Sequence, residues 1–525
     1  MKRFKFVLAA VMSLFLIGAC SRSAPQAVIG FSDFSALESA AVDENAGTDC
    51  AVACKQLRVE FRYIVYVGKQ IYAYWDEKKK DTGTDFDSLA ASLESSITDK
   101  TSDTDYFTII RDWSAAFHDG HVNAIPRDDL SKFEIYSSPV RLQIYEAASL
   151  NEKVFVSELK SAEFDLKLGD QVLAINGIPI KVALDNVEKQ SNGSTARMRR
   201  SRAASRLVDV WGVENSVQEL SLTVLRDKTK ITVKLPRTIE VMDSEKKVVA
   251  PVTGATLLKA MVLPGQIGYL RVDAFMGTQM GALIDQAMHN LKDTKALIID
   301  LRINGGGDAT ANFVLARLSK TDLVRYQVSP SLNPYVMAIR PDLFGLEEII
   351  GTGFAQWLPI KVKANTLENY VGKPVFALTS PRCFSACDTF VAALKSNKLA
   401  VILGEGTGGG TGTPLNFELP YSKHSFRYSV IRGKTIGGEA IEGVGTLPDV
   451  VILPVAADLV TKKDTQLAAM IEYVQNAVNP TMNNSANLAQ HVRNAFGDVW
   501  AQGFEKSPTT QEMQLVKDLA PNDEL

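Results

Sequence analysis

The segment Ala296-Leu-Ile-Ile-Asp-Leu-Arg302, followed by Ile303-Asn-Gly-Gly-Gly-Asp308, decides how the second half of this chain folds. Its first part is a short apolar run that favours a buried strand. The three consecutive glycines after it let the backbone turn sharply and present free N–H groups, which can hold an anion. Neither of the glycine-rich phosphate motifs, G-x-x-x-x-G-K-S/T or G-x-G-x-x-G, is matched here, so a phosphate cradle is disfavoured.

Apolar strands alternate with helical segments on both sides of this segment, from Gly265 to Pro454. The expected elements are a strand at Ile267 to Val272, a helix from about Met280 to Leu291, a strand at Ala296 to Leu301, a helix after Gly307, a strand at Val375 to Leu378, a helix after Ser385 and a strand at Ala400 to Leu403. This alternation predicts βα units. An amphipathic helix is expected near Leu467 to Val474.

The first half of the chain has two different patterns. From Leu57 to about Phe117 the apolar spacing is helical, and the last helix ends at His118-Asp119-Gly120-His121. Strand-like runs follow, and Leu168-Gly-Asp-Gln-Val-Leu-Ala-Ile-Asn-Gly177 has the turn residues of a β-hairpin. A strand pair at Leu220 to Arg226 and Thr229 to Leu235 completes this module. The arginine-rich residues 189–217 predict a solvated helix.

Composition limits the function. The chain has 525 residues, which predicts several structural units. It is 46% hydrophobic and 22% charged, as in ordinary globular proteins, and its net charge of -3 provides no basic field for nucleic acid.

The N-terminus has the features of an export signal. Lys2, Arg3 and Lys5 precede an apolar run, Phe6 to Ile17, that is too short for a membrane span. The run ends in Ile17-Gly-Ala-Cys20, which resembles a bacterial lipoprotein signal, and Ser21 resembles the signal for outer-membrane sorting. Cys20 is then the lipidation site, residues 1–19 the signal peptide and 20–48 a tether. A plain secretory signal is the alternative.

The other four cysteines form two C-x-x-x-C pairs, Cys50/Cys54 and Cys383/Cys387. In an exported chain disulfides persist, and we favour pairing within each couple. Free buried thiols are the alternative, because a bridge over four residues must satisfy strict geometry. Zinc bound by four thiolates is less favoured, since the C-x-x-C spacing is missing.

Ser385 falls at the start of the helix that follows the strand Pro374 to Thr379. The unpaired N–H groups and the dipole of a helix N-terminus favour developing negative charge, as an oxyanion hole requires. A serine at that place can equally be a simple N-cap, and the local sequence alone favours the cap.

A family resemblance changes that balance. The segment Leu168–Gly177 resembles the core of PDZ domains, which bind extended C-terminal peptides at a sheet edge. Three further motifs occur in the order found in the tail-specific (carboxyl-terminal processing) serine peptidases: D-L-R-x-N-x-G-G at 300–307, S-A-x-D at 385–388 and E-G-x-G-x-x-P-D at 442–449. The resemblance covers roughly residues 55–475. It implies that Ser385 is the nucleophile and that the amides of Gly306, Gly307 and Ala386 form the oxyanion hole.

One departure concerns the general base. The lysine of the best-known members falls on Gly410 here, so another group must activate the serine. Asp119-Gly120-His121 resembles the D-G-H motif of the branch that includes tricorn protease, which implies that His121 is the base. In that branch a glutamate near the E-G-x-G motif orients the pair, which implies Glu442, with Glu439 as a weaker choice. A displaced Lys434, or a metal held by His118 and His121, is less favoured.

These observations predict an α/β multidomain protein: a helical N-terminal domain (49–134), a PDZ-like β module (135–240), an αββ/crotonase-like catalytic domain (241–478) and a polar tail (479–525). The expected function is that of a serine endopeptidase of the cell envelope, which is attached to the membrane by a lipid and needs no metal or organic cofactor. Its expected substrates are extended or poorly folded polypeptides, bound by their C-terminal tails at the PDZ-like module. The alternative is a peptide- or ligand-binding protein of the same fold that has lost catalysis, which the missing lysine favours.

Overall fold

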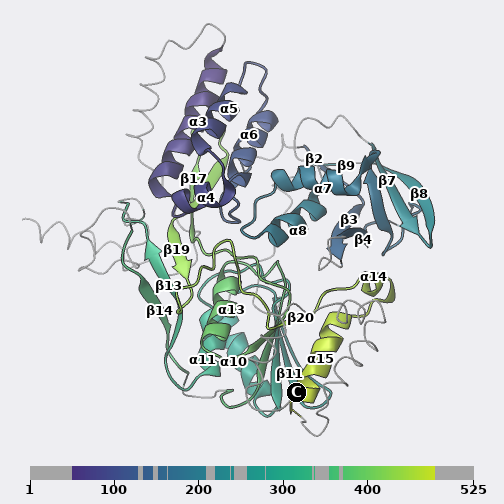
Figure 1. Ribbon diagram of the computed structural model, residues 1–525, viewed down its shortest axis with the longest axis vertical. Helices are drawn as coiled ribbons and strands as arrows, with labels where there is room; N and C mark the ends of the chain where they lie inside the picture. Colours follow the sequence, from purple (N-terminus) through teal and green to yellow (C-terminus); the bar gives the residue numbers. More distant parts are fainter. Residues whose placement is uncertain are drawn as a thin grey trace, which may run out of the picture.

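The computed structural model in Figure 1 describes the following residues: 50–127, 134–145, 152–161, 163–208, 219–236, 238–241, 257–277, 279–333, 336, 354–365 and 370–478. The predicted signal peptide, the lipidation site Cys20, the tether and the polar tail lie outside them. Within the described ranges, no helix combines the length and the apolar composition needed to cross a bilayer.

A six-stranded sheet forms the centre of the second half of the chain. Its strands, in spatial order, are β10 (Leu258–Leu263), β11 (Ile267–Val272), β12 (Ala296–Asp300), β15 (Val375–Thr379), β16 (Val401–Gly404) and β20 (Val450–Val451). Only β10 runs antiparallel to its neighbour; the other pairs are parallel. The predicted βα alternation is therefore confirmed, and β12 and β15 end side by side at one edge.

Helices cover both faces of this sheet (Figure 1). On one face lie α10 (Met280–Leu291), α11 (Ala311–Leu318) and α13 (Ala386–Ser396), and on the other lies α15 (Thr465–Val478). All five residues of β12 are buried, because alternate side chains reach opposite layers. Leu297 and Ile299 pack with α10, α11 and α13, whereas Ile298 packs with α15.

The N-terminal helices are those that the apolar spacing predicts: α3 (Val52–Ile71), α4 (Trp75–Thr82), α5 (Phe86–Ser95) and α6 (Asp103–Ala115). They do not enclose a core of their own. Phe417 of β17 (Pro414–Glu418) and Tyr428 of β18 (Ser425–Ser429) belong to the same buried cluster, and Trp113 donates a 2.8 Å hydrogen bond to the Tyr428 hydroxyl. The strand β1 (Asn123–Ile125) pairs with β18. The helical unit is thus completed by strands from the catalytic half.

A second small sheet adjoins this cluster. It contains β14 (Leu358–Val362), β13 (Leu323–Pro330) and β19 (Ile431–Lys434), in that spatial order. A two-stranded ribbon of β2 (Glu134–Ser137) and β9 (Thr238–Val241) leads into and out of the middle module.

The middle module is the predicted β structure. Its strands are β3 (Val140–Tyr145), β4 (Lys153–Leu159), β5 (Gln171–Ile175), β6 (Ile178–Pro179), β7 (Glu219–Arg226) and β8 (Thr229–Pro236), with the helices α7 (Ile180–Lys189) and α8 (Ala196–Arg206). Asn176 and Gly177 have φ values of 50° and 78°, as a tight hairpin turn between β5 and β6 requires. The short α14 (Ala457–Thr461) brings Ala456 and Leu459 against Tyr145 and Phe155 of the module.

The helix predicted within residues 189–217 is present as α8, but the expectation that it is solvated is wrong. Met198, Ala203 and Ala204 of α8 are buried, and the amide of Thr195 donates a 3.2 Å hydrogen bond to the carbonyl of Gly408 in the catalytic half. The arginine-rich composition misled the sequence analysis because many of these guanidinium groups bond to acidic side chains or carbonyls. Arg200, for example, contacts Glu152, Asp185 and Glu188.

Both cysteine couples form disulfides within the pair, Cys50–Cys54 and Cys383–Cys387. The favoured pairing is confirmed. The first bond closes the start of α3, and the second encloses Ser385 at the start of α13.

Candidate active site

Ser385 occupies a constrained turn between β15 and α13. Its φ is 61° and its ψ is −116°, a backbone conformation that costs a non-glycine residue about 1–3 kcal/mol. The buried carboxylate of Asp388 stabilises this turn. It accepts hydrogen bonds from the amides of Ser385 (2.9 Å), Gly409 (2.8 Å) and Gly410 (2.9 Å). Burial raises the pKa of Asp388 to about 7, and the hydrogen bonds to it oppose this rise.

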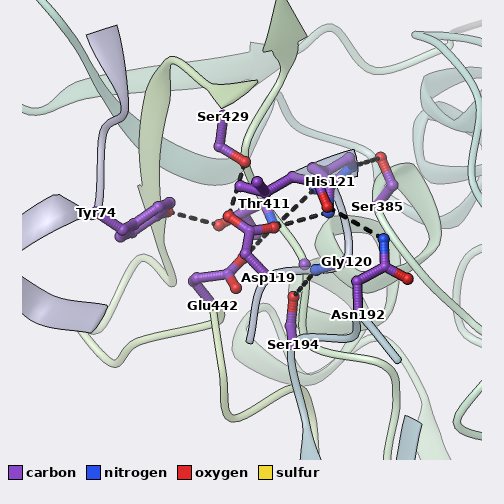
Figure 2. A network of polar contacts seen from close by, with 12 residues as sticks. Tyr74, Asp119, Gly120, His121, Asn192, Ser194, Ser385, Thr411, Ser429 and Glu442 are labelled. Carbon is purple, nitrogen blue, oxygen red and sulfur yellow. Dashed lines mark hydrogen bonds and ion pairs between the residues drawn. The ribbon is translucent and has the colours of Figure 1, made fainter. Parts of the chain in front are cut away.

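His121 lies opposite this serine, as Figure 2 shows, with 3.0 Å between His121 Nε2 and Ser385 Oγ. His121 lies in the segment that follows α6. The side chain of Asp119 holds this segment in place, because it accepts a 2.7 Å hydrogen bond from the His121 amide. The aromatic ring of Phe384 lies 4.5 Å from the His121 ring, between centroids. At Gly120 an added Cβ would come within 2.5 Å of that phenyl ring, so the close approach of the two segments requires glycine.

The imidazole is buried, and burial lowers the pKa of His121 to about 4. The negative charge of Asp119 opposes this shift because it stabilises the protonated ring. A neutral ring is therefore present near pH 7. If Nε2 is to accept the serine proton, Nδ1 must carry the ring hydrogen. Nδ1 faces Oδ1 of Asp119 at 4.0 Å and has no hydrogen-bond partner within the described part of the chain.

Two buried carboxylates lie behind His121. Asp119 accepts hydrogen bonds from the hydroxyls of Tyr72 (3.1 Å) and Ser429 (2.8 Å). Glu442 contacts the ammonium of Lys78 at 2.9 Å and accepts a 3.1 Å hydrogen bond from the amide of Thr411. Burial and the neighbouring Asp119 raise the pKa of Glu442 to about 7, against the lowering effect of Lys78.

Asp119, His121 and Glu442 place one possible ligand atom each within 4.8 Å of one another, which is a spacing that a metal ion can use. Their present partners favour another role. Hydroxyl, amide and ammonium groups already donate to both carboxylates, and Lys78 supplies a positive charge directly at Glu442. The two carboxylates therefore belong to a charged and polar network beside the imidazole.

The predicted oxyanion donors surround Ser385 unequally. An added Cβ at Gly306 would meet the Phe384 carbonyl at 2.5 Å and the Ser385 Cβ at 2.8 Å, so this backbone passes directly beside the serine. The amide of Gly306 itself donates to Asn304 Oδ1 at 2.8 Å. The amides of Gly307 and Ala386 have no hydrogen-bond acceptor among the described residues. This leaves Gly307 and Ala386 as the better candidates.

The other basic and acidic candidates lie elsewhere. An added Cβ at Gly410 would come within 2.0 Å of the Phe384 ring, so no lysine side chain fits at that position in this fold. The ammonium of Lys434 lies 4.0 Å from the centroid of the Trp357 ring. Glu439 is exposed and bonds to Thr435.

Sequence reasoning missed several residues of this network. Asp119 is part of the quoted D-G-H motif and could have been found there. Asp388 is likewise part of the quoted S-A-x-D motif. Lys78 and Tyr72 had no such signal, because their partners lie far along the chain. Lys78 and its partner Glu442 are 364 residues apart, and Tyr72 and its partner Asp119 are 47 residues apart.

Comparison with known families and structures agrees with this geometry. Residues 266–452 match the model of peptidase family S41. This segment, less than half of the chain, is similar to the peptidases of family S41. The chain is accordingly a serine-type peptidase, and the matched residues contain β11, β12, β15, β16 and β20 of the α/β sheet together with Ser385.

Solved structures extend the likeness of fold beyond the S41 domain. Mature CPAF, alone or complexed with lactacystin, aligns with a TM-score of 0.65 and 16% identity over 82% of this chain and 99% of that chain. A serine-to-alanine mutant of CPAF aligns with a TM-score of 0.66 over 83% and 99%. Tricorn protease also matches, with a TM-score of 0.40 and 14% identity over 81% of this chain and 37% of that one, a likeness too small to assign the chain to its branch.

Proposed function

We propose that this S41 peptidase is an endopeptidase in which Ser385 is the nucleophile and His121 the general base. The observation that carries the proposal is the 3.0 Å contact between His121 Nε2 and Ser385 Oγ, made by a neutral, buried imidazole. The serine is held in a strained turn where the N-terminus of α13 favours negative charge.

In the acylation step, His121 Nε2 takes the proton from Ser385 Oγ while the oxygen attacks the carbonyl carbon of the scissile peptide bond. The amides of Gly307 and Ala386 donate to the resulting oxyanion. The imidazolium then gives its proton to the leaving amine as the C–N bond breaks. A water molecule, activated by the same imidazole, hydrolyses the acyl-enzyme.

Asp119 and Glu442 orient and stabilise the imidazolium. Their negative charges lie on the Nδ1 side, where the ring carries its second proton during turnover. Lys78 limits the excess negative charge, because it pairs with Glu442 and also donates a 2.8 Å hydrogen bond to the His118 carbonyl.

The middle module is the proposed PDZ-like substrate receptor. Support comes from its hairpin turn at Asn176-Gly177 and from β3, which ends the sheet and leaves an edge for strand addition. Substrates are then extended or poorly folded polypeptides presented by their C-terminal tails. Deleting residues 138–236 should impair cleavage of long substrates more than of short peptides. Equal losses would instead assign the module a structural role.

The proposed location is the cell envelope, on a lipid attached to Cys20, at the outer membrane facing the periplasm. Support comes from the signal-like segment 1–19 and from the two disulfides, which suit an oxidising compartment. A Cys20→Ala variant should leave the membrane fraction. Retention of this variant after an alkaline wash would exclude the lipid anchor.

The decisive test of the mechanism is covalent labelling with a fluorophosphonate probe. The purified wild-type protein should be labelled, and labelling should be lost in both Ser385→Ala and His121→Ala, because the serine needs its base. Labelling that persists in Ser385→Ala would place the nucleophile elsewhere. No labelling of folded wild-type protein would support the binding-protein alternative.

A further inference from the structure

Two arginines beside the catalytic pair have no acidic partner at salt-bridge distance. Arg202 of α8 donates from Nη1 to the backbone oxygen (3.1 Å) and side-chain oxygen (2.9 Å) of Asn192. The side chain of Arg427, in β18, makes no hydrogen bond or ion pair with the described residues, and its Nε is buried without a partner. Two other arginines of α8, Arg197 and Arg200, differ in this respect because they pair with carboxylates.

The position of Arg202 is fixed relative to the reacting groups. Its guanidinium carbon lies 5.6 Å from the centroid of the Phe384 ring, and that ring lies 4.5 Å from the His121 ring. Arg202 also holds Asn192, whose side chain donates to the Val122 carbonyl next to His121 (Figure 2). Together, the distance from the His121 ring to the Phe384 ring and the distance from that ring to the Arg202 guanidinium add up to at most about 10 Å. An extended peptide covers this length with about three residues.

Arg427 belongs to strand β18, whereas Arg202 belongs to helix α8 of the middle module. Arg427 is the register partner of Asn123 in the β1–β18 pair, two residues beyond His121. Side chains two residues apart in a strand share a face, so Arg427 lies on the face from which Ser429 contacts Asp119. Phe426 and Tyr428 point instead into the aromatic core.

The charges of the two guanidinium groups repel each other, and the negative charge of Asp119 stabilises both. Burial, and then repulsion by Arg427, lower the pKa of Arg202 to about 10, so it remains charged near neutral pH. Burial also lowers the pKa of Arg427, while Asp119 opposes this shift. Partly buried cations that repel each other and have no ion-pair partner are stabilised by a bound anion.

We propose that Arg202 and Arg427 form a carboxylate-binding subsite, which takes an acidic group of the polypeptide substrate within about three residues of the scissile bond. The inference rests on the proposed peptidase function. The carboxylate has two possible sources, an Asp or Glu side chain or the α-carboxylate at the end of the substrate, and both offer the two oxygens that guanidinium groups bind.

The test uses matched peptides and the full-length protein. In one series both termini are blocked and Glu replaces Gln at single positions within three residues of the cleaved bond. In the other, a free C-terminal carboxylate is compared with its amide. We expect wild-type kcat/KM to favour the acidic member of one series by about tenfold, because hydrogen bonds to a charged group are strong. The responding series identifies the source of the carboxylate.

Variants locate the effect. In Arg427→Gln and in Arg202→Gln, kcat/KM for the acidic peptide divided by kcat/KM for the neutral peptide should fall to about one. Arg197→Gln is the control on the same helix, and the ratio should stay at its wild-type value because Arg197 already pairs with Glu405. Equal wild-type rates for acidic and neutral peptides in both series would overturn the proposal, and so would a preference that both variants retain. The wild-type comparison decides even if a variant fails to fold.

Binding separates this proposal from the catalytic one. Fluorescence anisotropy of the same labelled peptides on Ser385→Ala protein needs no turnover. Preferential binding of acidic peptides, lost on adding Arg427→Gln, supports the subsite even if the wild-type protein cleaves nothing. Cleavage without any acidic preference would retain the peptidase and remove the subsite.

Discussion

The two halves of the candidate active site are built in different ways. The nucleophile half consists of Ser385 in its turn and the neighbouring Gly307 loop. Backbone amides that donate to Asp388 hold the turn, and the Cys383–Cys387 disulfide spans it. The base half gathers Lys78, Asp119, His121 and Glu442 from separate segments and is held mainly by charged and polar side chains. The first half should therefore depend on one carboxylate, that of Asp388, whereas the second should respond to the loss of any one of several charges.

The largest effects should come from the pair that joins the halves. We expect Ser385→Ala and His121→Ala each to lower kcat by about 10⁴-fold or more, and the double variant to be little worse, because nucleophile and base act as one unit. Lys434→Ala is the control and should retain nearly normal turnover. Near-normal turnover in His121→Ala together with complete loss in Ser385→Ala would mean that another base serves the serine.

The charges of the base half should come next. Glu442→Gln keeps the shape but leaves the Lys78 ammonium buried without its acidic partner, which should lower the free energy of unfolding by about 3–5 kcal/mol. Adding Lys78→Met should restore most of this stability, as denaturant unfolding can show, but not the activity, which we expect to fall about a hundredfold. A double variant with normal kcat would show that Glu442 has only a structural role.

The pH profile distinguishes the halves without removing the base. Because burial lowers the pKa of His121 to about 4, the neutral base persists in acid, and kcat/KM should fall about tenfold per pH unit only below that value. The ordinary histidine pKa of about 6.5 therefore should not govern the activity. Any transition near pH 7 should disappear in Glu442→Gln or Asp388→Asn, since burial raises both of these pKa values to about 7. A limb near 6.5 that survives in both variants would contradict this assignment.

The smallest effects should come from the disulfides, which provide a matched pair. Both close loops with a sequence separation of 4, so loss of either, by Cys→Ser at both positions, should cost about 2 kcal/mol of unfolding free energy in the chain-entropy model. Only the Cys383–Cys387 loss should also lower kcat, by several-fold, because that bond surrounds Ser385. Equal activity of the two variants would show that backbone hydrogen bonds alone hold the nucleophile turn.

The sequence predicted four strands of the central sheet and its helices closely, since buried runs and glycine turns are local signals; β11 and α10 have the expected bounds. It did not predict β10 or the smaller sheets that contain β13 and β17. It also predicted that Ser385 and His121 would meet, through a family resemblance rather than through their own spacing. The ion pair of Lys78 with Glu442 could not be predicted, because it joins residues 364 apart through tertiary packing. The packing of α8 was missed because arginine counts do not reveal which guanidinium groups find partners.

The aromatic cluster shared by the N-terminal helices and β17–β18 has a consequence for the order in which the protein matures. A ribosome makes residues 50–126 long before residues 414–431, so the helices emerge with Trp113 and its neighbours lacking the contacts that β17 and β18 supply. His121 is held by the same late strands, through Ser429 and Asp119. Proteolytic competence is therefore among the last properties that the nascent chain acquires, and a chain stopped before residue 414 cannot digest its surroundings.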